Sequence, residues 1–143
     1  MQTEMERIHQ LLKSHDLKAT RTRVALLSLL AAYPTALALS SIEKALSCDR
    51  MTLYRVIRKL ESLCLLHRVL DQQGTSCFFL DAFHQRRPQL QNQPRHLHFS
   101  CKKCHTIYWL KESDHPVISL PDDFSASNVS MTIFGICPAC NPV

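Results

Sequence analysis

Apolar residues recur at helical spacing through the first third of the chain. The two series are Met5, Ile8, Leu11 and Leu12, and then Val24, Leu27, Leu30 and Ala31. Each series predicts a helix with one buried face, and Pro34 ends the second helix. Ser40 precedes Glu43 by three positions, the spacing of a reciprocal N-terminal cap, which predicts a third helix starting at this serine.

A fourth helix is predicted over residues 50–64, and its two faces differ in character. The apolar face holds Leu53, Val56, Ile57, Leu60, Leu63 and Cys64. The opposite face holds Tyr54, Arg55, Arg58, Lys59 and Ser62, with Glu61 at its margin. Most charged helix faces are simply solvated. A face that is cationic and carries an aromatic ring also fits the phosphates and base edges of a nucleic acid.

Two β-prone runs follow in "LLHRVLDQQGTSCFFL", separated by a turn that contains Gly74. This arrangement predicts a hairpin. Helices followed by such a hairpin make a winged helix-turn-helix, in which the last helix enters the major groove and the hairpin touches the neighbouring backbone. Residues 1–80 are therefore expected to form a winged-helix DNA-binding domain.

The pattern changes after this hairpin. Residues 81–95 hold two prolines, four glutamines and three arginines, a composition that predicts a linker. Residues 96–143 hold the short β-prone runs "HLHF", "TIYWL" and "VSMTIFGI", which predict a small mixed sheet, with one short helix near residues 118–124. A domain of this size buries little apolar area, so it needs a metal, a partner chain or both.

Composition narrows the function. The net charge is +5, and residues 1–80 contribute +4 of it, from 11 Lys and Arg against 7 Asp and Glu, which fits nucleic-acid binding. With two glycines in the chain, a glycine-rich phosphate loop is excluded. No spacing orients a nucleophile against a base, so no enzyme activity is expected. No apolar run is long enough to cross a bilayer and no secretory signal is visible, so we expect a cytoplasmic protein with no membrane partner.

Four of the seven cysteines form two C-x-x-C pairs, Cys101 with Cys104 and Cys137 with Cys140. Two such pairs supply the tetrahedral sulfur set that structural zinc prefers. One pair alone would also suit a redox dithiol. Two pairs flanking a β-rich segment favour zinc over redox chemistry or accidental pairing. Zinc bound in this way contributes folding free energy on the order of 10 kcal/mol.

His96 and His98 fall on the same face of a predicted strand, where two imidazoles can share a metal ion. Two ligands do not complete a site. The nearest further candidates in sequence are His84, Asp81, Glu112, Asp114 and His115. The alternative is a pair of ordinary histidines hydrogen-bonded to their neighbours, and the residues alone leave both interpretations open.

The segments "TLYRVIRKLESL", "HLHFSCKKC" and "GICPAC", in this order, resemble the ferric uptake regulator family of dimeric, metal-responsive bacterial repressors. The resemblance extends from about Lys18 to Cys140. It implies an α+β fold in which an N-terminal winged helix-turn-helix precedes a small zinc-stabilised α/β dimerisation domain. It also implies a homodimer that binds a palindromic operator in double-stranded DNA.

The resemblance also implies roles for single residues. It places Tyr54 on bases, Arg55 on the DNA backbone, and a basic residue at Lys18 or Arg21 near the minor groove or the phosphates. The full set of DNA contacts that we expect is Lys18, Arg21, Thr52, Tyr54, Arg55, Arg58 and Lys59. The four cysteines match the family's structural zinc. A second, sensory metal, which can be zinc, iron or manganese, falls on His96 and His98, with His84 as our candidate for a third ligand.

The chain departs from the family where the other sensory ligands belong. The loop "YPTALALS" lacks the family's histidine, the acidic position after the wing holds Phe79 or Leu80, and the one after "CKKC" holds Trp109. Either His84, Asp81 or another residue rebuilds the sensory site, or DNA binding is under some other control.

We therefore expect a DNA-binding transcriptional regulator, a repressor with a structural zinc, that responds to metal through a second site near His96 and His98. Two alternatives are a thiol-based redox sensor and a zinc-stabilised interaction protein that does not bind DNA. The redox alternative requires a reactive thiol. Cys64, expected to be buried among leucines, and Cys77, on a predicted strand, have no activating cluster around them.

Overall fold

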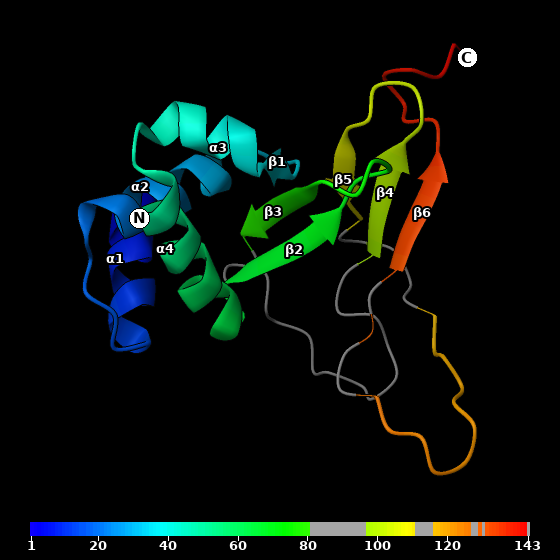
Figure 1. Ribbon diagram of the computed structural model, residues 1–143, viewed down its shortest axis with the longest axis horizontal. Helices are drawn as coiled ribbons and strands as arrows, with labels where there is room; N and C mark the ends of the chain where they lie inside the picture. Colours follow the sequence, from blue (N-terminus) through cyan, green and yellow to red (C-terminus); the bar gives the residue numbers. More distant parts are fainter. Residues whose placement is uncertain (81–96, 111–115, 127–128, 130, 143) are drawn as a thin grey trace. The chain divides into compact units, whose positions relative to one another are not determined.

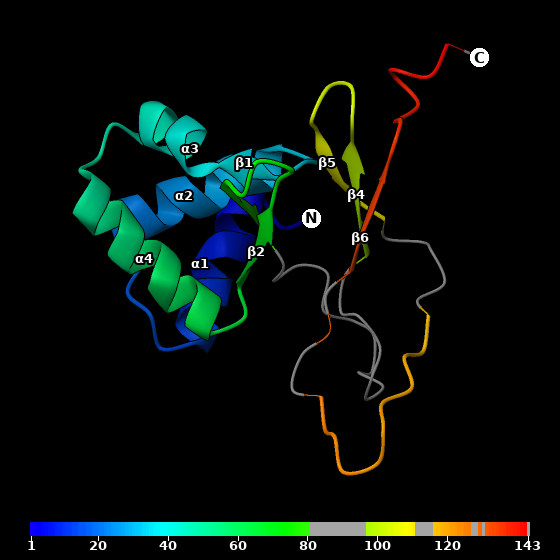
Figure 2. The ribbon, with the colours of Figure 1, turned by 45° about the vertical axis from the view of Figure 1, so that its right-hand side comes forward.

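The computed structural model describes residues 1–80, 97–110, 116–126, 129 and 131–142. The chain divides into two compact units, Met1–Gln85 and Arg86–Val143. The elements of the first unit are α1 (Glu4–Ser14), α2 (Arg21–Ala32), β1 (Leu37–Ala38), α3 (Leu39–Leu46), α4 (Arg50–Ser62), β2 (Leu66–Leu70) and β3 (Ser76–Leu80). Helices α1, α3 and α4 all contact α2, and the β2–β3 hairpin follows α4 directly (Figures 1 and 2). This is the predicted winged helix-turn-helix.

The first unit is built around one apolar core. Its buried members are Ile8, Leu12, Leu26, Leu27, Leu30, Ile42, Leu53, Ile57, Leu60, Leu65, Leu66, Phe78 and Leu80. The helical periodicities therefore identified the buried faces, except that Met5 of the first series is 48% exposed. In α2 the buried stripe runs through Leu26, Leu27 and Leu30, whereas Val24 and Ala31 pack at its margin.

The capping box of this unit lies at the start of α1. The Thr3 hydroxyl accepts the Glu6 N–H at 3.2 Å, and the Glu6 carboxylate accepts the Thr3 N–H at 2.8 Å. The cap predicted at Ser40 is wrong, because α3 begins one residue earlier and its N-cap, Ala38, makes no side-chain hydrogen bond. Strand β1 ends at Ala38 after pairing with β3, so strand pairing leads directly into this helix.

Helix α4 ends at Ser62, and a tight C-terminal turn follows it. The Cys64 N–H donates to the Glu61 carbonyl at 2.9 Å, and the Leu65 N–H donates to the Leu60 carbonyl at 3.0 Å. This pattern places Cys64 in the left-handed region, at φ 57°, and returns Leu65 to the core. The expectation that Cys64 is buried is therefore wrong, since its thiol is exposed.

The second unit contains a mixed sheet, as predicted. Its strands β4 (Leu97–Cys101), β5 (Ile107–Trp109) and β6 (Met131–Gly135) have the order β5-β4-β6, with β5 antiparallel and β6 parallel to β4 (Figure 1). The helix predicted near residues 118–124 is wrong. A turn replaces it, in which the Phe124 N–H donates to the Pro121 carbonyl at 3.2 Å and Asp123 has φ 70°. Pro121 disfavours a helix interior because it lacks an N–H donor.

None of the helices within the described residues is long and apolar enough to span a bilayer.

Candidate metal centre and nucleic-acid interface

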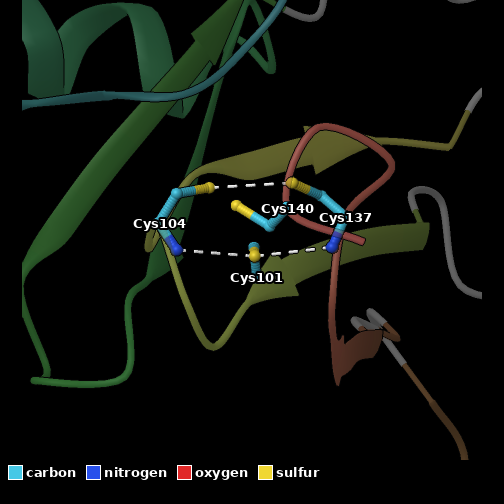
Figure 3. Close-up of side chains that lie close together, drawn as sticks. All are labelled: Cys101, Cys104, Cys137 and Cys140. Carbon is cyan, nitrogen blue, oxygen red and sulfur yellow. Dashed lines mark hydrogen bonds between the residues drawn. The ribbon is translucent and has the colours of Figure 1, made fainter. Parts of the chain in front are cut away.

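The two cysteine pairs follow two neighbouring parallel strands. Cys101 is the last residue of β4, and it pairs with Gly135, the last residue of β6. Because the strands are parallel, the turns after them leave the sheet at the same end. The first turn holds Cys104 and the second holds Cys137 and Cys140, so the structure brings together the four cysteines that the sequence predicted (Figure 3).

The geometry of this cluster matches a tetrahedral metal site. All four sulfur atoms lie within 4.8 Å of one another, and the sulfurs of Cys104 and Cys137 are 3.7 Å apart. Zinc bound tetrahedrally at ~2.3 Å holds its sulfur ligands about 3.8 Å apart. Cys101 and Cys137 are fully buried, Cys140 is half-buried and Cys104 is exposed. The four-cysteine cluster therefore fits structural zinc.

The backbone prepares Cys101 to bind a metal. The N–H groups of Lys103, Cys104 and Cys137 donate to its sulfur at 3.4, 3.5 and 3.4 Å. Figure 3 shows the bonds from Cys104 and Cys137. These hydrogen bonds, led by the one from Cys104, lower the pKa of Cys101 from 9.0 to about 6. A metal ligand must be a thiolate, and Cys101 favours that form at neutral pH.

The pKa values of the other thiols depend on hydrogen bonds with neighbouring groups, including one another. The Tyr108 hydroxyl hydrogen bond lowers the pKa of Cys137, while the hydrogen bond with Cys137 raises the pKa of Cys140 to about 12. Four thiols this close therefore do not all ionise by themselves. Zinc, when bound, supplies the positive charge that keeps all four deprotonated.

Gly135 allows close packing within the sheet. A Cβ atom at this position would lie 2.9 Å from Cζ and 3.2 Å from Cε2 of Phe99, on the neighbouring strand β4. The glycine is the last residue of β6, where it admits the Phe99 ring beside the cysteine turns.

The predicted second metal site is described only at His98. The His98 side chain is fully buried. In the sheet, His98 of β4 lies opposite Trp109 of β5 and Thr132 of β6. Trp109 thus stands beside His98 on the neighbouring strand. His96 and His84 lie outside the described residues, as do Asp81, Glu112, Asp114 and His115. Within the described part of the chain, the four cysteines are the one group of three or more clustered potential ligands.

Helix α4 presents the second candidate site, in the first unit. Leu53, Ile57 and Leu60 are buried in the core. The opposite face exposes the predicted DNA-contact residues Thr52, Tyr54, Arg55, Arg58 and Lys59. The Arg58 guanidinium lies 5.7 Å from the Tyr54 ring centroid, a cation–π contact that gives the two side chains a common orientation.

Lys18 and Arg21 lie exposed where α2 begins. Thr20 caps this helix by accepting the Arg23 N–H at 3.4 Å. The Arg23 side chain donates from Nη1 to the Lys18 carbonyl at 3.0 Å, which fixes the backbone that carries Lys18. Sequence reasoning missed Arg23, because a hydrogen bond to a backbone carbonyl leaves no residue-type pattern.

The wing is tied to α4 by Arg68, which sequence reasoning also missed. Its Nε and Nη2 atoms donate to the Glu61 carboxylate at 2.8 and 2.9 Å. The same guanidinium lies 5.3 Å from the Phe78 ring centroid, on the adjacent strand. The hairpin therefore has a defined orientation relative to the end of α4.

No protein-family model matches the chain, and no curated protein matches it. Solved structures do match. A zinc uptake regulator complexed with zinc and DNA is 15% identical, with a TM-score of 0.68 over 97% of this chain and 96% of that one. The chain has the ferric uptake regulator fold. The Helicobacter pylori ferric uptake regulator Fur, described with three functional metal-binding sites, is 17% identical, with a TM-score of 0.60 over 95% and 90% of the two chains.

The Vibrio cholerae ferric uptake regulator is 21% identical, with a TM-score of 0.60 over 90% of this chain and 98% of that one. Identities this low establish the fold and leave the function to be argued from this chain's own residues. The resemblance to ferric uptake regulators, first drawn from three short segments, is thereby confirmed for the fold.

Proposed function

We propose that the protein is a transcriptional regulator, a repressor, that binds double-stranded DNA as a homodimer through α4. The observation that carries this proposal is the exposed cationic face of α4 in a winged helix. Arg55, Arg58 and Lys59 lie opposite the buried face of the helix, with Tyr54 among them. A helix of this kind enters the major groove, where side chains reach base edges and cations neutralise phosphates.

The remaining basic contacts would steady the winged helix on the duplex. Lys18 is exposed on the loop that Arg23 fixes and Arg21 is exposed at the start of α2, and we assign both to phosphates or to the minor groove. Contacts of this kind set affinity, register and salt dependence. Sequence recognition falls to the residues of α4 that reach base edges.

We assign the homodimer contact to strand β6 of the second unit. The strand is at an edge of its sheet, and its Ile133 and Phe134 are 41% and 51% exposed. An apolar edge strand is stable in water when another chain covers it. Two copies joined there would present two α4 helices to the two halves of a palindromic operator.

A sensory metal at His98, completed by His96 and His84, is the finer part of the proposal. Zinc, iron and manganese all accept imidazole ligands. Counting metals by elemental analysis, on protein purified without added ions, tests it. Two metal ions per chain support the sensory site, and a single zinc ion that Cys137→Ser removes limits the metal to the structural role.

DNA binding is tested with duplexes that the full-length, zinc-loaded protein selects from a random pool. We expect Arg55→Ala to weaken binding about tenfold and to lower the slope of log affinity against log salt by about one. Tyr54→Ala should weaken binding to the selected duplex more than to a scrambled one. Lys13→Ala removes an exposed cation from α1 and serves as the matched control. If neither α4 variant differs from the wild type, α4 is not the DNA-binding helix.

A further inference from the structure

The most exposed large apolar side chain of α4 lies in its first turn. Met51 is 60% exposed, compared with 42% for Tyr54 on the next turn. Because an α-helix rotates by about 100° per residue, Met51 is set about 180° from the buried Leu60. Tyr54, Arg55 and Arg58 follow Met51 at the i+3, i+4 and i+7 positions, so the four side chains share one face. Met51 thus stands at the N-terminal end of the face that we assign to DNA.

The neighbours of Met51 in this first turn are engaged within the protein. Arg50 Nε lies 3.0 Å from the Glu43 carboxylate of α3. The Thr52 N–H donates to the Asp49 carboxylate at 2.9 Å, and the Thr52 side chain also hydrogen-bonds this carboxylate, which lowers the pKa of Asp49. Both residues therefore serve the start of the helix. Met51 is the apolar residue among the three, and its exposed side chain lies opposite the buried face of the helix.

The chemistry of Met51 restricts what it can recognise. A thioether side chain makes no strong hydrogen bond, but it is flexible and polarisable and packs well on small apolar groups. The major groove offers one such group, the C5-methyl of thymine, while the other base edges there present hydrogen-bond donors and acceptors. N-terminal residues of a recognition helix are the ones that reach base edges.

We propose that Met51 is a specificity-determining residue that recognises thymine methyl groups in the major groove. This inference rests on the proposed DNA-binding function of α4. Met51 would add an apolar contact to the recognition of the DNA sequence by the polar and aromatic residues of this face. Each half of the operator should therefore contain at least one thymine whose C5-methyl group contributes to binding, while the rest of that base is not needed for the contact with Met51.

The test replaces each thymine of the selected duplex, one at a time, by deoxyuridine, which lacks only the C5-methyl group. Dissociation constants are measured by fluorescence anisotropy for the wild type, Met51→Ala and Met5→Ala. Met5 is an exposed methionine on α1, 48% exposed, and its substitution is the matched control. Alanine is a strong helix former, so both variants should melt at or above the wild-type temperature.

We expect deoxyuridine at one or more positions of each half-site to weaken binding of the wild type and Met5→Ala about fourfold, the effect of losing one buried methyl-sized group. Met51→Ala should bind the thymine duplex at least fourfold more weakly and should not distinguish thymine from deoxyuridine at those positions. Met51→Leu should restore the distinction in part.

Three results would overturn the inference. The wild type could be insensitive to deoxyuridine at every position, or Met51→Ala could keep the full wild-type sensitivity at every position. In either case the DNA-binding function stands and the role of Met51 falls, with any remaining methyl sensitivity belonging to another residue such as Tyr54. If the wild type enriches no duplex from the random pool, the proposed function fails and this inference fails with it.

Discussion

Buried side chains are distributed very differently in the two units of the chain. In the first unit, thirteen buried apolar residues from α1, α2, α3, α4, the hairpin and the turn between α4 and β2 form one core. In the described part of the second unit, the buried residues are Leu97, His98, Ser100, Cys101, Ile107 and Cys137, of which Leu97 and Ile107 alone are large apolar side chains. Large apolar side chains there are instead exposed, among them Phe124 at 69% and Phe134 at 51%.

This difference indicates two sources of stability. A core of leucines and isoleucines stabilises a helical unit through apolar burial alone. A three-stranded sheet with exposed apolar residues lacks enough buried area, so a metal ion and a partner chain must supply the rest. The second unit should therefore depend on its four thiolates, and the first should not.

Removing one zinc ligand should have the largest effect. We expect Cys137→Ser to abolish tight zinc binding and to unfold or disperse the second unit, since a closed thiolate site contributes on the order of 10 kcal/mol. The helices should remain, because all helices of the described residues lie in the first unit. Far-ultraviolet circular dichroism follows those helices, and the fluorescence of Trp109, the one tryptophan of the chain, follows the second unit.

Cys64→Ser is the matched control for this experiment. It removes a sulfur from an exposed turn of the first unit, so zinc content and Trp109 fluorescence should stay at wild-type values. A Cys137→Ser protein that keeps its zinc, its Trp109 emission and its dimeric state would contradict the zinc assignment and the comparison between the units.

The zinc site could be predicted from the sequence because its information is local. Two thiols separated by two residues reach one ion within a single turn, whatever the surrounding fold. The cationic face of α4 was predictable for the same reason, since helical spacing alone separates Arg55 and Arg58 from Ile57. Both features needed the structure only to show that the separate pieces meet.

Features that are set by contacts between elements or by a backbone turn could not be predicted. Strand β1 is two residues long and exists because it pairs with β3, so no periodicity marks it, and the start of α3 was misplaced as a result. The exposure of Cys64 follows from a left-handed turn whose hydrogen bonds reach back to Glu61 and Leu60. The tie between Arg68 and Glu61 likewise joins two elements.

Truncating a side chain of the apolar core should destabilise the first unit and leave the zinc site of the second unit intact. Leu60 has no exposed surface, so we expect Leu60→Ala to reduce the unfolding free energy of the first unit by ~2–5 kcal/mol. The melting temperature of the helices, measured by circular dichroism, should fall, while the zinc content should not change. Leu70→Ala, at a residue that is 58% exposed, should change stability by less than ~0.5 kcal/mol. Equal effects of the two substitutions would show that the core has been assigned to the wrong face of α4.

The thiols of the first unit are expected to have no special reactivity. Their alkylation rates should follow their exposure and their pKa. Burial raises the pKa of Cys77 from 9.0 to about 11, so its reactive thiolate is about a hundredfold scarcer at neutral pH. With zinc bound, iodoacetamide should alkylate Cys64 first and Cys77 slowly, with the Cys77 rate rising with pH until about 11. Mass spectrometry of timed samples gives both rates. Rapid alkylation of Cys77 at pH 7, with loss of DNA binding, would instead favour the redox-sensor alternative.

The smallest expected effect comes from comparing substitutions at the starts of two helices of the first unit, α1 and α3. Thr3 and Glu6 cap α1 reciprocally, so Thr3→Ala should destabilise the unit by ~1 kcal/mol. Ser40 is exposed within α3 and makes no cap, so Ser40→Ala should be neutral or slightly stabilising, because alanine is the better helix former. Both substitutions remove a hydroxyl group from the first residues of a helix in one folding unit, Thr3→Ala with a methyl group besides, and chemical denaturation measures both. A larger loss for Ser40→Ala than for Thr3→Ala would mean that α3 begins at the serine, and that pairing of β1 with β3 does not determine where this helix starts.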